Sequence, residues 1–273
     1  MGEYTPKHIV NAHKTTLTPG EYIFMAMWIV IGGWILAWNI LSYTSLTMLP
    51  SVFSVHILFA LTCISIIVWI YLFTKGYSLY STIAKLICLV LVSIIYVRVG
   101  IFYSPFQTKL QAFGEFAPFS FALGWLLFSF ILNFFDAVLS KETSRRMQAR
   151  GAMLVCITLL VPCGFMLWLT SDIFFCFSLM LVYIGIGSAQ YMTGNTHLLG
   201  SMTSMTHNQS SQYANQFTYQ NVSTKDSLES QQSNEHQNHT HITTQNLEVG
   251  KLAYGCAVLV GIGIIIRIAH AFS

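Results

Sequence analysis

Charged residues are scarce in this chain, and their scarcity excludes an ordinary soluble protein. Asp, Glu, Lys and Arg make up 8% of the 273 residues, whereas hydrophobic residues make up 54%. Soluble domains carry roughly 25% charged residues, so this chain lacks the charge to cover a water-exposed surface. The formal net charge of +3 is also too small to indicate nucleic-acid binding.

The usual signatures of metal sites and catalysis are missing as well. All six cysteines fall in apolar segments without a Cys-x-x-Cys pair, which favours packing roles over disulfides or metal ligation. No phosphate-binding loop, serine-protease motif or histidine ladder for haem is present. No Asp or Glu lies deep in an apolar run, which argues against a proton- or cation-coupled carrier.

Long apolar runs are what the sequence does contain. A bilayer is crossed by about 20 apolar residues in a helix, so the runs predict an all-α, polytopic transmembrane helix bundle with about seven spanning helices. The fifth and sixth runs are separated only by residues 170–172, which predicts a tight helical hairpin, and Pro162 can kink the fifth without ending it. The predicted spans are 22–42, 52–74, 81–103, 117–139, 151–170, 173–193 and 250–270.

The chain divides into four parts. Residues 1–21 form a cytoplasmic N-terminal segment, 22–193 a six-helix membrane region, 194–249 a polar loop, and 250–273 the seventh helix and C-terminus. Lys and Arg resist translocation, so the basic loop from Lys141 to Arg150 should be cytoplasmic. Alternation then places the N-terminus inside and the C-terminus outside.

The 194–249 loop is rich in Gln, Asn, Ser, Thr and His, and this composition predicts a disordered segment because it cannot form a core. Its sequons at Asn208, Asn221 and Asn238 carry little weight against the charge pattern, since such matches arise by chance in this composition. His236, His239 and His241 are weak candidates for binding a soft or borderline metal ion. The simpler interpretation is a solvated linker.

Ionisable residues inside the spans are few, and such residues usually mark a pathway, a ligand or a partner. The predicted topology places His56, Arg98, Arg267 and His270 in one layer near the outer face, and the spacing of three puts the last two on one helix face. They could bind one polar or anionic ligand, or each could reach the outer headgroups separately. Lys85 and Asp136 lie near cytoplasmic helix ends, where we expect them to reach water.

Scattered patches of the sequence resemble a known family. Tyr96-Val97-Arg98-Val99 leads into Tyr103-Ser104-Pro105 and an aromatic fourth helix, and Arg267 stands late in the last helix. Glu21-Tyr22, ahead of a helix containing Gly32-Gly33, adds a fainter likeness. This pattern is similar to the membrane-anchor subunits of dimethyl sulfoxide reductase-type molybdoenzymes, although those typically have eight helices.

The resemblance implies a membrane anchor subunit of a respiratory oxidoreductase in a bacterial inner membrane, active in anaerobic electron transport. Such a subunit is not catalytic alone: it oxidises menaquinol or ubiquinol near the outer face and passes electrons to iron–sulfur and molybdopterin subunits. The anchor itself would bind no metal, and His56, Arg98, Arg267 and His270 would form its quinol site. One alternative is a multi-pass transporter or channel for a small solute or metal ion, and another is an assembly or sensory membrane protein without catalysis of its own.

Overall fold

The computed structural model describes residues 18–19, 21–44, 50–102, 112–138, 145–191 and 247–269. Over these ranges the chain is helical except at short connections, and seven helices are long and apolar enough to cross a membrane. This confirms the predicted fold class and makes the chain an integral membrane protein. The helices are α2 (Glu21–Thr44), α3 (Pro50–Thr74), α4 (Ser78–Phe102), α6 (Ala117–Val138), α7 (Arg145–Leu169) and two further spans, Ile173–Tyr191 and Leu247–Ala269.

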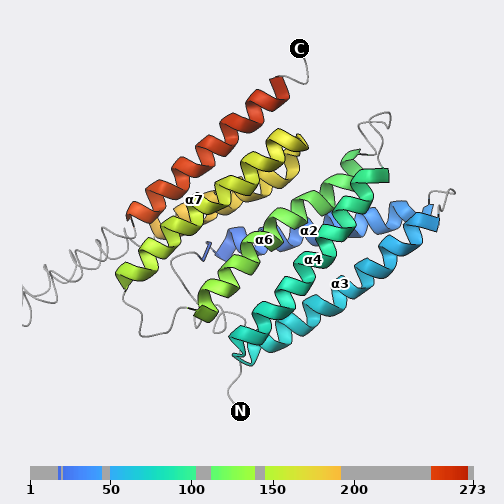
Figure 1. Cartoon of the computed structure of the whole chain (residues 1–273), viewed down its shortest axis with the longest axis horizontal. Coiled ribbons are helices and arrows are strands. Elements are labelled where there is room, and N and C mark those ends of the chain that lie inside the picture. The colour runs from blue at the N-terminus through green and yellow to red at the C-terminus, as the bar shows by residue number, and fades with distance from the viewer. Residues whose placement is uncertain are drawn as a thin grey trace, which may run out of the picture.

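Successive helices run in opposite directions (Figure 1). In this view α3 and the 247–269 helix lie at opposite edges of the bundle, and α4 and α6 lie between them. The central members are α6 and the 173–191 helix, because 56% of each apolar window is buried, against 17% in both α2 and α3. The outer helices therefore present most of their apolar side chains to lipid.

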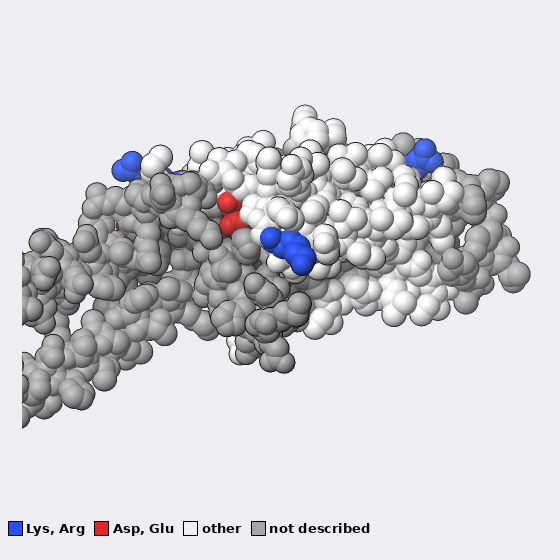
Figure 2. Space-filling view, turned by 90° about the horizontal axis from the view of Figure 1, so that it is seen from below, with Lys and Arg blue, Asp and Glu red and all other residues white. Residues whose placement is uncertain are grey.

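The surface fits a bilayer environment. One face, shown in Figure 2, carries charged atoms at only a few points, with a broad uncharged area between them. Large apolar side chains are exposed along the helices, among them Ile29, Ile67 and Val161. In water such a surface would be a liability, whereas in hydrocarbon it is the expected exterior.

Two connections show how the sequence turns the chain. After α3, Gly76 adopts a left-handed conformation with φ of 77°. The amide of Gly76 donates to Phe73 O at 3.0 Å and that of Tyr77 donates to Leu72 O at 3.0 Å. These bonds form a Schellman motif, which satisfies carbonyls that the helix end leaves open.

The second connection is the hairpin that the sequence predicts at residues 170–172. Ser171 takes a positive φ of 57°, and the amide of Asp172 donates back to Met166 O at 3.3 Å. The next helix starts at once because the Asp172 carboxylate accepts hydrogen bonds from the amides of Phe174 and Phe175, both at 3.1 Å. Asp172 is thus an N-cap. Pro162 lies inside α7 without ending it, as predicted.

The helices approach closely where glycine allows it. A Cβ on Gly124 of α6 would collide with the Ser178 hydroxyl, and would lie 2.8 Å from Phe175 O. A Cβ on Gly187 would lie 2.9 Å from the Tyr254 ring. Glycines therefore allow the 173–191 helix to pack closely against α6 and against the 247–269 helix.

A short π-helical turn, η1 (Ala112–Phe116), precedes α6. The Phe116 ring packs against that of Tyr96 with centroids 4.9 Å apart, which joins this turn to α4.

Candidate functional site

Lys85 of α4 is completely buried inside the membrane region, with a relative exposure of 0%. The expectation that it reaches water was wrong. Its Nζ lies 3.3 Å from the ring centroid of Trp69 on α3 and 5.1 Å from that of Trp28 on α2. The two indole rings are nearly parallel, with centroids 6.0 Å apart and an interplanar angle of 18°. The ammonium group is therefore held by aromatic faces instead of by water.

The helix contacts explain why Lys85 points inward. Ser65 of α3 donates a 2.9 Å hydrogen bond to the carbonyl of Ala84, which fixes the α4 backbone beside α3 at this level. Trp69 follows Ser65 by one helical turn and so lies on the same face of α3. The face of α3 that contacts Ala84 through Ser65 therefore also places the Trp69 ring against Lys85, the next residue of α4.

A third tryptophan extends this group. The Trp125 ring of α6 makes an edge contact with Trp28, with centroids 6.1 Å apart and planes at 89°. We call Trp28, Trp69, Lys85 and Trp125 the tryptophan–lysine cluster. Three of its nitrogen atoms, Lys85 Nζ, Trp69 Nε1 and Trp125 Nε1, are buried and donate a hydrogen bond to no group of the described residues.

The energies involved show that this cluster is incompletely satisfied. A desolvated cation–π contact contributes about 2 kcal/mol or more. Burying an ammonium ion costs several kcal/mol even after relaxation, and each unsatisfied indole N–H adds about 1–3 kcal/mol. The aromatic contacts therefore offset only part of the cost, and the cluster is rich in donors and poor in acceptors.

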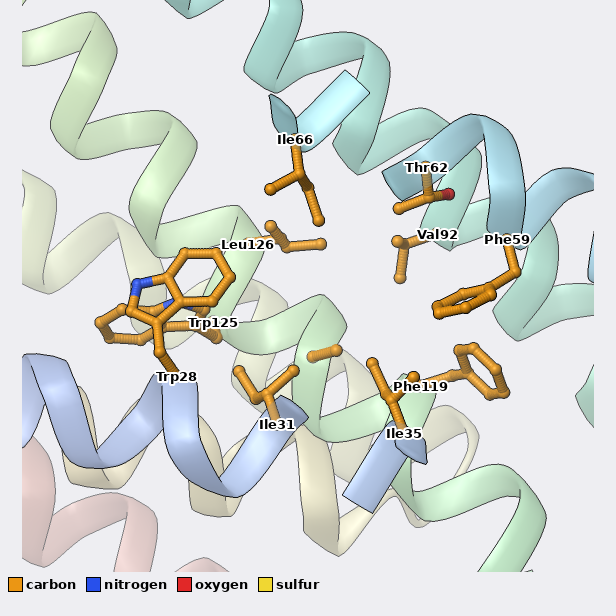
Figure 3. A pocket seen from close by; sticks show the side chains of 11 residues that line it. Trp28, Ile31, Ile35, Phe59, Thr62, Ile66, Val92, Phe119, Trp125 and Leu126 are labelled. Atoms are coloured by element: carbon orange, nitrogen blue, oxygen red, sulfur yellow. The ribbon is translucent and has the colours of Figure 1, made fainter. Parts of the chain in front are cut away.

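An apolar cavity of about 40 Å³ adjoins the cluster, and Trp28 and Trp125 belong to both (Figure 3). In Figure 3 these two rings lie at one end of the cavity, and Phe59 and Phe119 lie at the other. Apart from the indole groups of Trp28 and Trp125, the one polar side chain in the lining is Thr62, whose hydroxyl donates to Leu58 O at 2.9 Å. The full lining is Trp28, Ile31, Ile35, Phe59, Thr62, Ile66, Val92, Phe119, Ala122, Trp125 and Leu126.

The volume decides what this cavity can hold as it stands. Pockets for drug-sized ligands have about 300–1,000 Å³, many times more than is present here. A large ligand would therefore have to separate the helices that line the cavity. The two that could move with the smallest loss of internal packing are α2 and α3, because they are among the least buried spans.

A second polar cluster lies at the opposite end of the bundle, where α4 ends and α6 begins. The buried Asp172 carboxylate accepts hydrogen bonds from the hydroxyls of Tyr96 at 2.7 Å and Ser120 at 2.6 Å, besides the two amides that it caps. The two hydroxyl bonds hold α4 and α6 to the start of the 173–191 helix, and the two amide bonds cap that helix. We read this cluster as structural, because its acceptors and donors match each other.

Three of the four residues predicted to form an outer-face site, His56, Arg98 and Arg267, are described by the structure, and they lie near one end of the bundle but in two places. Arg98 is exposed, and its Nη1 donates a 2.9 Å hydrogen bond to Ser54 Oγ on α3. His56, also on α3, packs its ring 5.1 Å from that of Trp38. These two residues thus belong to the edge that includes α3.

Arg267 belongs to the other edge. Its Nε donates to Leu167 O at 2.9 Å and its Nη2 to Trp168 O at 3.1 Å. These carbonyls are in the last turn of α7, where no helical amide can reach them, so Arg267 caps the end of α7. His270, like the loop residues His236, His239 and His241, lies outside the described residues. A role of the four outer-face residues in ligand binding stays a prediction.

Sequence reasoning missed the tryptophan–lysine cluster because it considered Lys85 alone. The sequence does contain a signal, which is the depth of each residue along its helix. Trp28 and Lys85 each stand seven residues after the first residue of their helix, and Trp69 stands five residues before the end of the helix between them. Antiparallel neighbours place these three side chains at one level, and a lysine level with two tryptophans suggests an aromatic cage.

The fold and this cluster define a polytopic helical membrane protein with a donor-rich aromatic site next to an apolar cavity. A family model described as TSPO-like protein matches residues 1–207, and the chain belongs to that family. The match includes the first six spans and leaves the 247–269 helix outside. No curated protein and no solved structure matches the chain.

The family match corrects the functional prediction. The likeness to molybdoenzyme anchor subunits was wrong, since its patches were short and the match to the TSPO-like family is continuous over most of the chain. The predicted respiratory anchor function was therefore wrong too, and the predicted role in anaerobic electron transport loses its support. The quinol substrate and the iron–sulfur and molybdopterin partners had no other support. The bacterial inner membrane had the same basis and stays a prediction.

Proposed function

We propose that this protein binds a flat, largely apolar ligand of the sterol or porphyrin class within its helix bundle and takes part in moving it through the membrane. The family match supports this class of ligand. The observation that carries the proposal is the aromatic, apolar cavity enclosed by α2, α3, α4 and α6. Trp28 lines this cavity and also belongs to the tryptophan–lysine cluster.

The chemistry of the lining suits such a molecule. Rings at both ends of the cavity offer stacking surfaces, and the aliphatic side chains between them offer no competing hydrogen bonds. Entry between α2 and α3 would come from the lipid side, where an apolar ligand is already dissolved. Opening the bundle there exchanges helix contacts for ligand contacts of a similar apolar kind.

Binding can be tested with the full chain in lipid nanodiscs. Protoporphyrin IX and the fluorescent sterol dehydroergosterol are the probes, and quenching of or energy transfer from tryptophan is the signal. We expect saturable binding of at least one probe, and we expect Trp28→Leu to weaken it about tenfold or more. The matched control is Trp168→Leu, because Trp168 is 77% exposed on α7. Equal, non-saturable signals in both variants and in empty nanodiscs would contradict the proposal.

We also infer that the N-terminus faces the cytoplasm. Lys75 follows α3, and Arg150 lies in the first turns of α7, so both lie at the end of the bundle where α2 starts. Basic residues collect on the cytoplasmic side. Labelling of a cysteine placed at residue 75 by an impermeant reagent in intact cells would contradict this orientation.

A further inference from the structure

Resting on the proposed function, we propose that the tryptophan–lysine cluster recognises a carboxylate on the ligand, so that the protein selects a flat carboxylic acid over a neutral sterol or ester. The cluster would bind the acid group while the adjoining cavity, opened by the ligand, holds the ring system. Lys85 is the residue that chiefly determines this specificity.

Hydrogen-bond donors outnumber acceptors in the tryptophan–lysine cluster. Lys85 Nζ, Trp69 Nε1 and Trp125 Nε1 are buried donors for which the described residues provide no acceptor. A neutral sterol has one hydroxyl and cannot balance an ammonium charge. A carboxylate brings two oxygen atoms, a full negative charge and the ability to accept several hydrogen bonds at once.

The tryptophan–lysine cluster lies at one end of the cavity. Trp28 lines the cavity and its ring also lies 5.1 Å from Lys85 Nζ, so a ligand that displaces or slides along this ring meets the ammonium group. Trp125 has the same double position, in the cavity lining and against Trp28. The cluster is thus the polar end of an otherwise apolar space.

Within the described part of the chain, Lys85 makes no hydrogen bond that would join helices. Asp172 shows what a buried charge looks like when it serves the fold, because hydroxyls and amides from three helices meet it. Among the described residues, Lys85 Nζ has no hydrogen-bond partner and lies over the rings of Trp28 and Trp69. A buried, ionisable side chain of this kind inside a membrane protein marks a ligand or pathway.

The experiment compares protoporphyrin IX with its dimethyl ester, which has the same ring and no carboxylate, on the full chain in nanodiscs. We expect the acid to bind at least about tenfold more tightly than the ester. Lys85→Met should bring this ratio near one and leave the ester affinity within about twofold. Lys75→Met, in which an exposed lysine after α3 is changed, should keep the wild-type ratio.

A second variant protects the test against misfolding of the first. Trp69→Phe keeps an aromatic face for Lys85 and removes one indole donor, and it should reduce acid binding several-fold with little effect on the ester. Equal binding of acid and ester by the wild type, or a preserved preference in Lys85→Met, would overturn the inference. If the ester or dehydroergosterol binds and the acid has no advantage, only this inference fails. If no probe binds, the proposed function fails with it.

Discussion

The Tyr96 hydroxyl donates a 2.7 Å hydrogen bond to the carboxylate of Asp172, a residue 76 positions further along the chain. Ser120 donates to the same carboxylate, so one buried acid ties α4 and α6 to the start of the 173–191 helix. The cap that begins this helix is thereby also a tertiary contact.

Replacing Asp172 by Ala should therefore be strongly destabilising. The variant loses an N-cap, which contributes about 1 kcal/mol, and leaves two buried hydroxyls unsatisfied at about 1–3 kcal/mol each. Asp172→Asn retains a good capping side chain and should cost less. Thermal unfolding in detergent would rank the two variants. Asp136→Ala is the control, since Asp136 is only partly buried and accepts a hydrogen bond from Ser78 at 3.2 Å. Equal melting temperatures for the two Asp172 variants would contradict the cap.

Arg267 provides a second stability test. Arg267→Ala leaves two carbonyls at the end of α7 open, and should lower stability by about 1–2 kcal/mol. Its affinity for protoporphyrin IX should stay unchanged, because the residue lies at the edge of the bundle away from α3. Equilibrium binding and thermal unfolding on the same sample measure both effects. A large loss of affinity with normal stability would instead favour a ligand site at the outer face.

Replacing Lys85 should raise the stability of the unliganded protein, whereas replacing Asp172 or Arg267 should lower it. Lys85 has no anionic partner among the described residues. Replacing such a buried charge by an apolar side chain of similar length is often neutral or stabilising by about 1–4 kcal/mol. We therefore expect Lys85→Met to raise the melting temperature in the absence of ligand. Lys75→Met should leave it unchanged. A clear decrease for Lys85→Met would mean that the ammonium group serves the fold.

Glycine contacts offer a matched pair of variants. Gly124→Ala forces a methyl group against the Ser178 hydroxyl and the Phe175 carbonyl, so overpacking should cost about 1–3 kcal/mol. Gly164→Ala, in α7, meets no atom within 4 Å and should be neutral or slightly stabilising through its helix propensity. Comparing their unfolding curves with that of the wild type checks the closeness of α6 to the 173–191 helix. Similar losses in both variants would contradict it.

Much of the architecture follows from the sequence by itself. Seven apolar runs of spanning length determine seven helices, because each backbone amide and carbonyl inside a bilayer must bond within its own helix. The hairpin at residues 170–172 follows from the same rule, since three residues cannot form a longer excursion. These features depend on local composition and length, which the sequence states directly.

The site was decided by the tertiary structure. A lysine at this depth on a lipid-facing surface can reach water. Lys85 does not, because its side chain points into the bundle against tryptophans of two other helices. Arg267 has the predicted depth, yet its partners are carbonyls 99 and 100 residues earlier. Depth along a helix is encoded in the sequence, whereas rotation about its axis and the neighbour on each face are set by how seven helices pack together.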